Sequence, residues 1–121
     1  MWLIKRNVLS SILLAAKHTY PKEFISLLGG DRKKKLVNEM IVLPATFGRN
    51  FSMLRLDLVP FDGKIIGSAH SHPGHSLSAS LGDLRSFPKL GWVHLIVSLP
   101  FDFNSVKLFS AKGKELSYKL I

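Results

Sequence analysis

The chain has 121 residues, and its 17 lysines and arginines outnumber its 8 acidic residues to give a formal net charge of +9. This length fits a single domain over residues 1–121. Because the sequence contains no cysteine, disulfides, CxxC zinc ribbons, iron–sulfur clusters and thiol nucleophiles are excluded. Any metal site must therefore use histidine, carboxylate and water ligands. The positive charge predicts attraction to anionic partners.

The N-terminal region imitates a secretion signal, since Lys5 and Arg6 precede an apolar stretch at residues 8–16. Apolar residues also come before these charges, however, and two serines interrupt the stretch. No segment contains the roughly 20 consecutive apolar residues that a membrane span needs. We therefore expect a cytoplasmic protein without a membrane segment.

The first half of the chain predicts a helix followed by two strands. Apolar residues recur with helical spacing over residues 7–19, and Asn7 is a candidate cap for this helix. A strand is expected over residues 23–28, ended by the pair Gly29-Gly30. The charged residues 31–35 then resemble an exposed hairpin connection to the next strand.

The remaining elements are mostly strands. A helix is expected over residues 80–90, where Pro88 weakens its end. Strands are expected over residues 36–43, 51–58, 64–72, 93–99, 106–110 and 116–121. This order predicts one mixed sheet with flanking helices, of the α+β or α/β class.

Two histidines on the strand 64–72 are the first chemical signal. His70 and His72 are two residues apart, so their side chains project from the same face of an extended strand. Pro73 favours an extended conformation at His72. A catalytic zinc site needs three protein ligands and an open position for water. Asp83, in the first turn of the next helix, is the candidate for the third ligand.

Each half of this pattern also has an ordinary structural interpretation. Paired histidines on a strand often only face solvent. The segment Ser80-x-x-Asp83 matches a capping box, in which the two side chains bond the free amides at a helix start. The combination of both halves at this spacing is much more specific than either one.

The pattern His70-x-His72, seven residues, and then Ser80-x-x-Asp83 resembles the signature of the JAMM (MPN-plus) metalloprotease family. The resemblance covers essentially the whole chain and implies the family's three-layer, cytidine-deaminase-like fold. It implies that His70, His72 and Asp83 bind one Zn²⁺ per chain, with water as the fourth ligand. Glu23 resembles the glutamate that takes a proton from this water and delivers it to the leaving amine. Ser80 resembles the hydroxyl that supports the tetrahedral oxyanion.

The resemblance also implies a substrate class. Family members cleave after the C-terminal Gly-Gly of ubiquitin or a ubiquitin-like modifier joined to a lysine of its target. The alternatives are a peptidase that processes a ubiquitin-fold sulfur-carrier protein, and a catalytically silent MPN-type scaffold. Residues 45–62 are our candidate contact for the substrate tail, because their aromatic side chains would otherwise be exposed. The short chain leaves little room for insertions that read ubiquitin-chain linkage.

Three further features have plain interpretations. His75 is expected to be a solvent-facing loop residue, although a contact with metal or substrate is the alternative. His94 is expected to be a packed strand residue. The run Arg32–Lys35 is expected to be a solvated turn, with attraction of an acidic substrate as the alternative. The chain has neither a stacking-aromatic motif nor a basic recognition helix, which disfavours nucleic acid as a partner.

Overall fold

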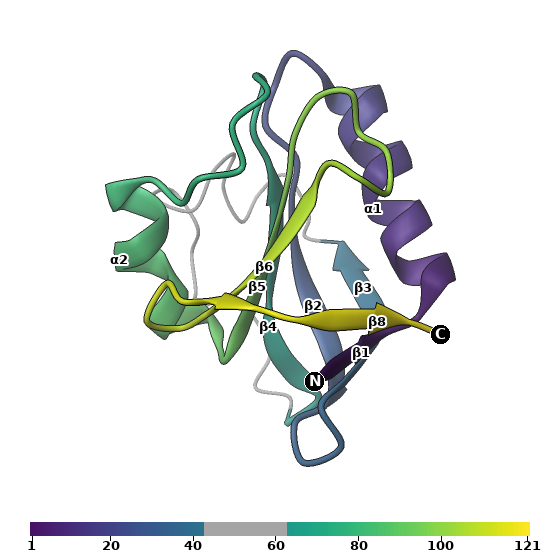
Figure 1. Ribbon diagram of the computed structural model, residues 1–121, viewed down its shortest axis with the longest axis vertical. Coiled ribbons are helices and arrows are strands. Elements are labelled where there is room, and N and C mark those ends of the chain that lie inside the picture. The colour runs from purple at the N-terminus through teal and green to yellow at the C-terminus, as the bar shows by residue number, and fades with distance from the viewer. Residues whose placement is uncertain (43–62) are drawn as a thin grey trace.

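The computed structural model describes residues 1–42 and 63–121, which form one mixed sheet with a helix on each side (Figure 1). The helices are α1 (Arg6–Thr19) and α2 (Leu81–Leu90). The strands of this part of the chain are β1 (Trp2–Ile4), β2 (Ile25–Asp31), β3 (Leu36–Val42), β4 (Ile65–Ser71), β5 (Val93–Val97), β6 (Val106–Ser110), β7 (Glu115–Leu116) and β8 (Tyr118–Leu120). The predicted mixed sheet with flanking helices is confirmed.

The helices cover opposite faces of the central strands. The apolar side of α1 is buried through residues at helical spacing, namely Val8, Leu9, Ile12, Leu13 and Ala16. These residues share a core with every second residue of β5, from Val93 to Val97. The alternate residue Ile96 instead packs with Phe87 of α2 and Phe109 of β6. Every residue of β5 is therefore buried, as expected for a strand covered on both faces.

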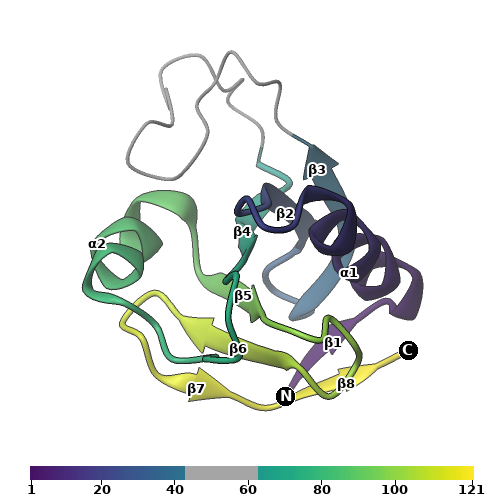
Figure 2. The same ribbon diagram turned by 90° about the horizontal axis from the view of Figure 1, so that it is seen from above.

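The sheet curls so far that its two ends are joined by a single residue. Its strand order is β7-β6-β5-β4-β2-β3-β1-β8. Only Ser117 separates β7, which pairs with β6, from β8, which pairs in parallel with β1. Seen from above, β6, β7, β8 and β1 follow one another along one side of the molecule (Figure 2). The C-terminal segment thus bridges both edges of the sheet.

The functional site lies at the carboxyl end of the parallel pair β4 and β5, which α2 connects. Residues from Gly67 to Ser71 pair in register with Val93 to Val97. On its other side β4 pairs antiparallel with β2, with His70 opposite Ile25. In sheets of this kind ligands bind beyond the carboxyl ends of parallel strands. The carboxyl end of β4 carries both histidines of the motif.

The N-terminal elements differ from the sequence prediction. No element is expected before residue 7, but Trp2–Ile4 form β1 between β3 and β8. The helix begins at Arg6 with Lys5 as its N-cap and no capping side chain, so Asn7 is not the cap. The reason is long-range pairing: both partners of β1 are distant in the chain, and a local pattern does not reveal them.

The strand expected to end before Gly29-Gly30 continues to Asp31, which corrects that prediction. A Cβ at Gly30 would collide with the Leu36 carbonyl oxygen, so the missing side chain permits the close approach of β3. The pairing with β3 also shifts register between the two glycines. Here glycine marks an irregularity inside a strand and does not end it.

Two strands in the C-terminal half also differ from the prediction. The strand expected over 116–121 is split at Ser117, and the strand expected over 93–99 ends at Val97. The turn between β2 and β3 is confirmed, with Arg32–Lys35 exposed. The strand expected at 51–58 and the substrate contact expected at 45–62 lie outside the described residues. Neither described helix combines the length and apolar character needed to cross a membrane.

Candidate active site

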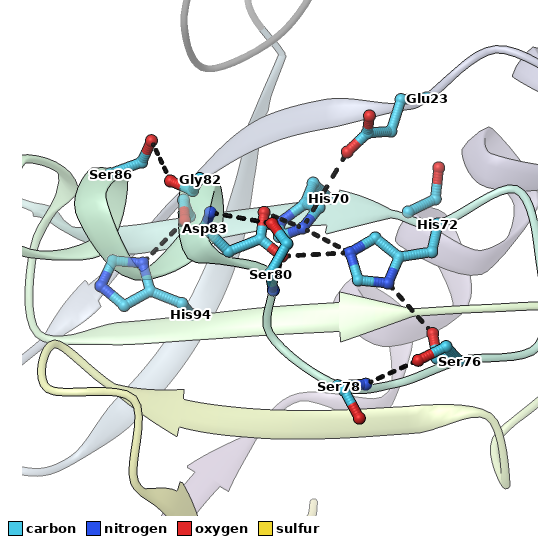
Figure 3. A network of polar contacts seen from close by, with 12 residues as sticks. Glu23, His70, His72, Ser76, Ser78, Ser80, Gly82, Asp83, Ser86 and His94 are labelled. Carbon is cyan, nitrogen blue, oxygen red and sulfur yellow. Dashed lines mark hydrogen bonds and ion pairs between the residues drawn. The ribbon is translucent and has the colours of Figure 1, made fainter.

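His70 and His72 converge at the carboxyl end of β4 (Figure 3). His70 lies inside the strand and is fully buried, whereas His72 lies one residue beyond it with 17% of its side chain exposed. Their Nε2 atoms are 3.1 Å apart. The alternate positions therefore project together, and the solvent-facing interpretation of this pair does not hold.

Asp83 reaches the same point from the first turn of α2. Its Oδ1 lies 3.0 Å from Nε2 of His70, and its Oδ2 lies 3.2 Å from Nε2 of His72. Asp83 is held there by a complete capping box: its amide donates to Ser80 Oγ at 3.0 Å, and the Ser80 amide donates to its Oδ2 at 2.8 Å. The helix cap and the contact with both imidazoles therefore exist together.

Glu23 approaches from the opposite side, two residues before β2 begins. Its Oε1 is 4.0 Å from Nε2 of His70, and 37% of its side chain is exposed. Ligand atoms of Glu23, His70 and His72 all lie within 4.8 Å of one another. The fold thus gathers four residues of the predicted site, from the approach to β2, the end of β4 and the start of α2.

The hydrogen bond of His72 at its other nitrogen fixes the direction of its lone pair. Nδ1 of His72 lies 3.0 Å from the carbonyl oxygen of Ser76. A carbonyl only accepts, so Nδ1 must donate, and neutral His72 then presents the lone pair of Nε2 to the cluster. This lone pair faces a carboxylate oxygen of Asp83, an arrangement that suits a proton or a metal ion between the two atoms.

The contacts between the imidazoles and the carboxylate shift the pKa values of His72 and Asp83. The hydrogen bond to Asp83 raises the pKa of His72 despite partial burial. Burial acts to raise the pKa of Asp83, but hydrogen bonds from His70 and His72 outweigh it and hold that pKa far below its usual range. Asp83 is therefore an anion at neutral pH, and a metal ion that binds here competes with a proton for Nε2 of His72.

The spacing of these atoms fits zinc. Tetrahedral ligands at about 2.0–2.1 Å from the ion lie roughly 3.3 Å from one another. The three contacts among His70, His72 and Asp83 measure 3.0–3.2 Å. Glu23 is farther from the imidazoles and more exposed than Asp83, whose side chain is 9% exposed. The distances thus favour Asp83 over Glu23 as the third ligand.

A cleft of about 660 Å³ opens beside the cluster. Its lining residues are small or hydroxyl-bearing, apart from the site residues themselves; they are Glu23, His72, Gly74, Ser76, Ser78, Ala79, Ser80, Gly82, Asp83 and Ser86. Ser80 Oγ faces this cleft and accepts the Asp83 amide, which leaves its hydroxyl hydrogen to donate elsewhere. The cleft can therefore admit a segment of bare main chain to the ion site.

The other histidines follow their ordinary interpretations. His75 is exposed. His94 is buried and packed, with its ring stacked on Phe87 at 4.3 Å and 1°. Its Nε2 lies 3.1 Å from the Gly91 carbonyl oxygen, so Nε2 donates, and Nδ1 accepts from Ser68 Oγ at 2.7 Å. Burial lowers the pKa of His94 to about 4, so it is neutral in the folded protein.

Sequence reasoning missed two contributors to this arrangement. Ser76 orients His72 through its main-chain carbonyl, for which no side-chain pattern exists. Ser68 fixes His94, and Phe87 lies between the rings of His94 and His70, with centroid distances of 4.3 and 6.5 Å. The only available signal for Ser68 was its position two residues before His70, on the same face of β4.

Comparison with known proteins agrees with this geometry. Residues 5–109 match the family model for prokaryotic homologs of the JAB domain. A probable metalloprotease of Haloferax volcanii is 33% identical over 120 residues, which is 92% of this chain and 74% of that protein. The expected zinc motif is therefore found in a chain whose curated relative is itself described as a metalloprotease.

Solved structures share the fold. One, described as a JAMM metalloprotease-like zinc site in the proteasome and signalosome, has a TM-score of 0.79 and 36% identity, with 100% of this chain and 98% of that chain covered. A JAB1/MPN domain protein from Archaeoglobus fulgidus also has a TM-score of 0.79, with 35% identity and coverages of 100% and 97%. A Desulfitobacterium hafniense protein at 22% identity shows the same fold, with a TM-score of 0.63 and coverages of 100% and 93%. The chain thus belongs to the JAMM/MPN metalloprotease family, among its prokaryotic JAB-domain members.

Proposed function

We propose that this protein is a zinc-dependent peptidase that cleaves after the C-terminal Gly-Gly of ubiquitin or a ubiquitin-like modifier, including the isopeptide bond to a lysine. One observation carries the proposal. His70, His72 and Asp83 meet at mutual distances of 3.0–3.2 Å, as zinc ligands do, while Glu23 stands 4.0 Å from His70. The site therefore offers three ligands and a fourth acidic group outside them.

His70, His72 and Asp83 would hold the zinc ion, which when bound would supply a Lewis acid for the attacking water and the scissile carbonyl. Glu23 then serves as the general base that takes a proton from the attacking water. Its partial exposure suits this role, because it can reach both the water and the leaving amine. After the tetrahedral stage, Glu23 returns the proton to that amine.

Ser80 supports the same reaction from the start of α2. Its hydroxyl oxygen accepts the Asp83 amide, which holds the side chain in place and leaves the hydroxyl hydrogen available to donate. A fixed donor directed at the developing oxyanion contributes about 10²–10³ in rate, because it needs no reorganisation during the reaction. The hydrogen bond that caps α2 thus also holds the Ser80 hydroxyl beside the proposed oxyanion position.

The lining of the cleft supports the substrate class. Gly74, Ala79 and Gly82 leave room for main chain, and Ser76 and Ser78 provide hydroxyl groups along it. A Gly-Gly tail has no side chains and fits such a lining. The net charge of +9 favours an acidic modifier protein through electrostatic attraction.

The first experiment measures zinc content. We expect about one zinc per chain after loading and dialysis, and loss of that zinc in Asp83→Asn. A wild-type protein that retains no zinc would identify the chain as an MPN-type scaffold and exclude the proposed reaction.

The second experiment measures cleavage. The probes are ubiquitin joined through its C-terminal glycine to the lysine of a fluorescent peptide, and a Gly-Gly-ended ubiquitin-fold protein of the same organism as a linear fusion. Glu23→Gln should keep zinc and slow cleavage about 10²–10⁴-fold, and the metal-loaded wild type should cleave at least one probe. Cleavage of the sulfur-carrier fusion alone would assign the enzyme to processing of that protein.

A further inference from the structure

Ser71, the last residue of β4, lies between His70 and His72 and has no role in the chemistry described above. Its side chain points to the opposite face of the strand from His70 and His72, and it is only 1% exposed. On that side it meets Phe24, the residue that follows Glu23 in the chain. Two hydrogen bonds connect them: the Ser71 amide donates to the Phe24 carbonyl oxygen at 2.9 Å, and the Phe24 amide donates to Ser71 Oγ at 2.8 Å.

The second bond departs from a regular strand ladder. Ile25 pairs with His70, so Phe24 stands opposite Ser71 as the next pair of the antiparallel ladder. In a regular ladder such a pair exchanges two main-chain hydrogen bonds. Here the Ser71 hydroxyl accepts the Phe24 amide in place of the main-chain carbonyl. The side chain thereby extends the pairing one residue beyond the start of β2.

This additional paired residue is Phe24, which directly follows Glu23 in the chain. The Phe24 amide belongs to the same planar peptide group as the Glu23 carbonyl, so the bond fixes the peptide directly after Glu23. Ser71 is also the chain neighbour of both imidazole residues. One hydroxyl therefore ties the segment that carries the acidic group to the strand that carries His70 and His72.

We propose that Ser71 is a positioning residue, whose hydroxyl holds Glu23 at its place beside the metal ligands. This inference rests on the proposed function, in which Glu23 is the general base. Without the hydroxyl, the Phe24 amide loses its acceptor, and of these two hydrogen bonds only the one from the Ser71 amide to the Phe24 carbonyl oxygen still holds this segment against β4. A displacement of about 1 Å in a catalytic group can reduce the rate about 100-fold.

The test compares Ser71→Ala with Ser71→Thr and Ser71→Cys. Threonine keeps the hydroxyl, and cysteine keeps a weak acceptor at nearly the same volume. Ser26→Ala is the matched control, because Ser26 is a fully buried serine of the neighbouring strand β2 whose Oγ makes no hydrogen bond to the described residues. Ser26→Ala therefore removes a buried serine hydroxyl from the same sheet but leaves the hydrogen bond of the Phe24 amide intact.

The first readout is hydrogen exchange of the Phe24 amide by NMR. We expect exchange at least about tenfold faster in Ser71→Ala, an intermediate rate in Ser71→Cys and restoration in Ser71→Thr, with no change in Ser26→Ala. Zinc affinity should stay within about threefold of the wild type in all of them. A Phe24 amide that stays protected in both Ser71→Ala and Ser71→Cys overturns the inference, whatever the activity.

The second readout is cleavage of the ubiquitin–lysine peptide by the zinc-loaded chains. Ser71→Ala should lower kcat about 10- to 100-fold with little change in KM, and Ser71→Thr should restore it. In the Glu23→Gln background the same substitution should have no further effect, because it acts through Glu23. An equal loss in both backgrounds would mean that Ser71 acts through the metal ligands or through stability, and would refute the inference. Failure of the wild type to cleave any probe is a failure of the proposed function, which the wild-type control reveals separately.

Discussion

The buried histidine beneath the metal site gives this protein a characteristic weakness in acid. His94 is fully buried, and burial lowers its pKa from 6.5 to about 4. In the unfolded chain it gains a proton as the pH falls through about 6.5, whereas in the folded protein it does so only near pH 4. The unfolded state therefore binds more protons between these values, and stability must fall as the pH falls through this window.

The magnitude follows from the two pKa values. They differ by about 2.5, and each pKa unit corresponds to about 1.36 kcal/mol, so His94 removes about 3 kcal/mol once the pH is below 4. Between pH 7 and pH 4.5 the loss is about 2 kcal/mol. This is a large fraction of the roughly 5–15 kcal/mol by which domains are stable.

The assay compares urea unfolding of the metal-free protein at these two pH values, in the presence of a chelator. The variant is Ser68→Ala/His94→Phe. It removes both partners of the Ser68–His94 hydrogen bond together and keeps an aromatic ring against Phe87. The control, His18→Gln, removes an exposed histidine from α1. The other titrating groups are unchanged in each comparison, so their contributions cancel.

We expect the wild type and His18→Gln to lose about 2 kcal/mol more than the double variant between pH 7 and pH 4.5. Parallel losses in all three chains would refute the reasoning, because they would show that His94 already binds a proton in the folded state. The difference between chains decides the matter, even if the double variant is less stable at pH 7.

Four further substitutions test the site and its support. Asp83→Asn should weaken zinc binding at least about 100-fold in competition with a chromogenic chelator, and wild-type affinity would exclude Asp83 as a ligand. Glu23→Gln should keep zinc but slow cleavage about 10²–10⁴-fold; an unchanged rate would remove Glu23 from the mechanism. Ser80→Ala should slow cleavage about 10²–10³-fold and cost about 1 kcal/mol in urea unfolding as a lost helix cap, and a loss of stability alone would leave Ser80 only its structural role. Gly67→Ala should destabilise the fold by about 2 kcal/mol or more, because its Cβ would collide with the Val93 carbonyl oxygen; a wild-type urea midpoint would show that β4 and β5 can move apart.

Much of the site was predictable because its residues are close in sequence or follow a periodic rule. His70 and His72 project together because strand side chains alternate, and Asp83 is positioned by the same capping box that starts α2. Glu23 is different. Nothing near it in the sequence points to His70, and only the family resemblance suggested the placement that the fold produces.

The parts of the fold that sequence missed depend on distant partners. Strand β1 exists because residues 2–4 find β3 and β8, and its three-residue length gives no periodicity to detect. Gly30 lies inside β2 because β3 approaches it too closely for a side chain. The sequence around Gly30 does not reveal this contact. The helix expected over residues 80–90, in contrast, does continue to Leu90 with Pro88 inside it, as predicted.

The bridge formed by residues 115–120 has a consequence for behaviour at high concentration. A long unpaired strand edge is a template on which another molecule can add its own strand. In the described sheet the outermost strands have only two and three residues, and they are parts of one continuous segment. These two strands therefore leave little main chain of their own for a second copy to pair with. The C-terminal segment covers the outer edge of β1 and part of the outer edge of β6, so substitutions that detach it should promote aggregation before they affect the metal site.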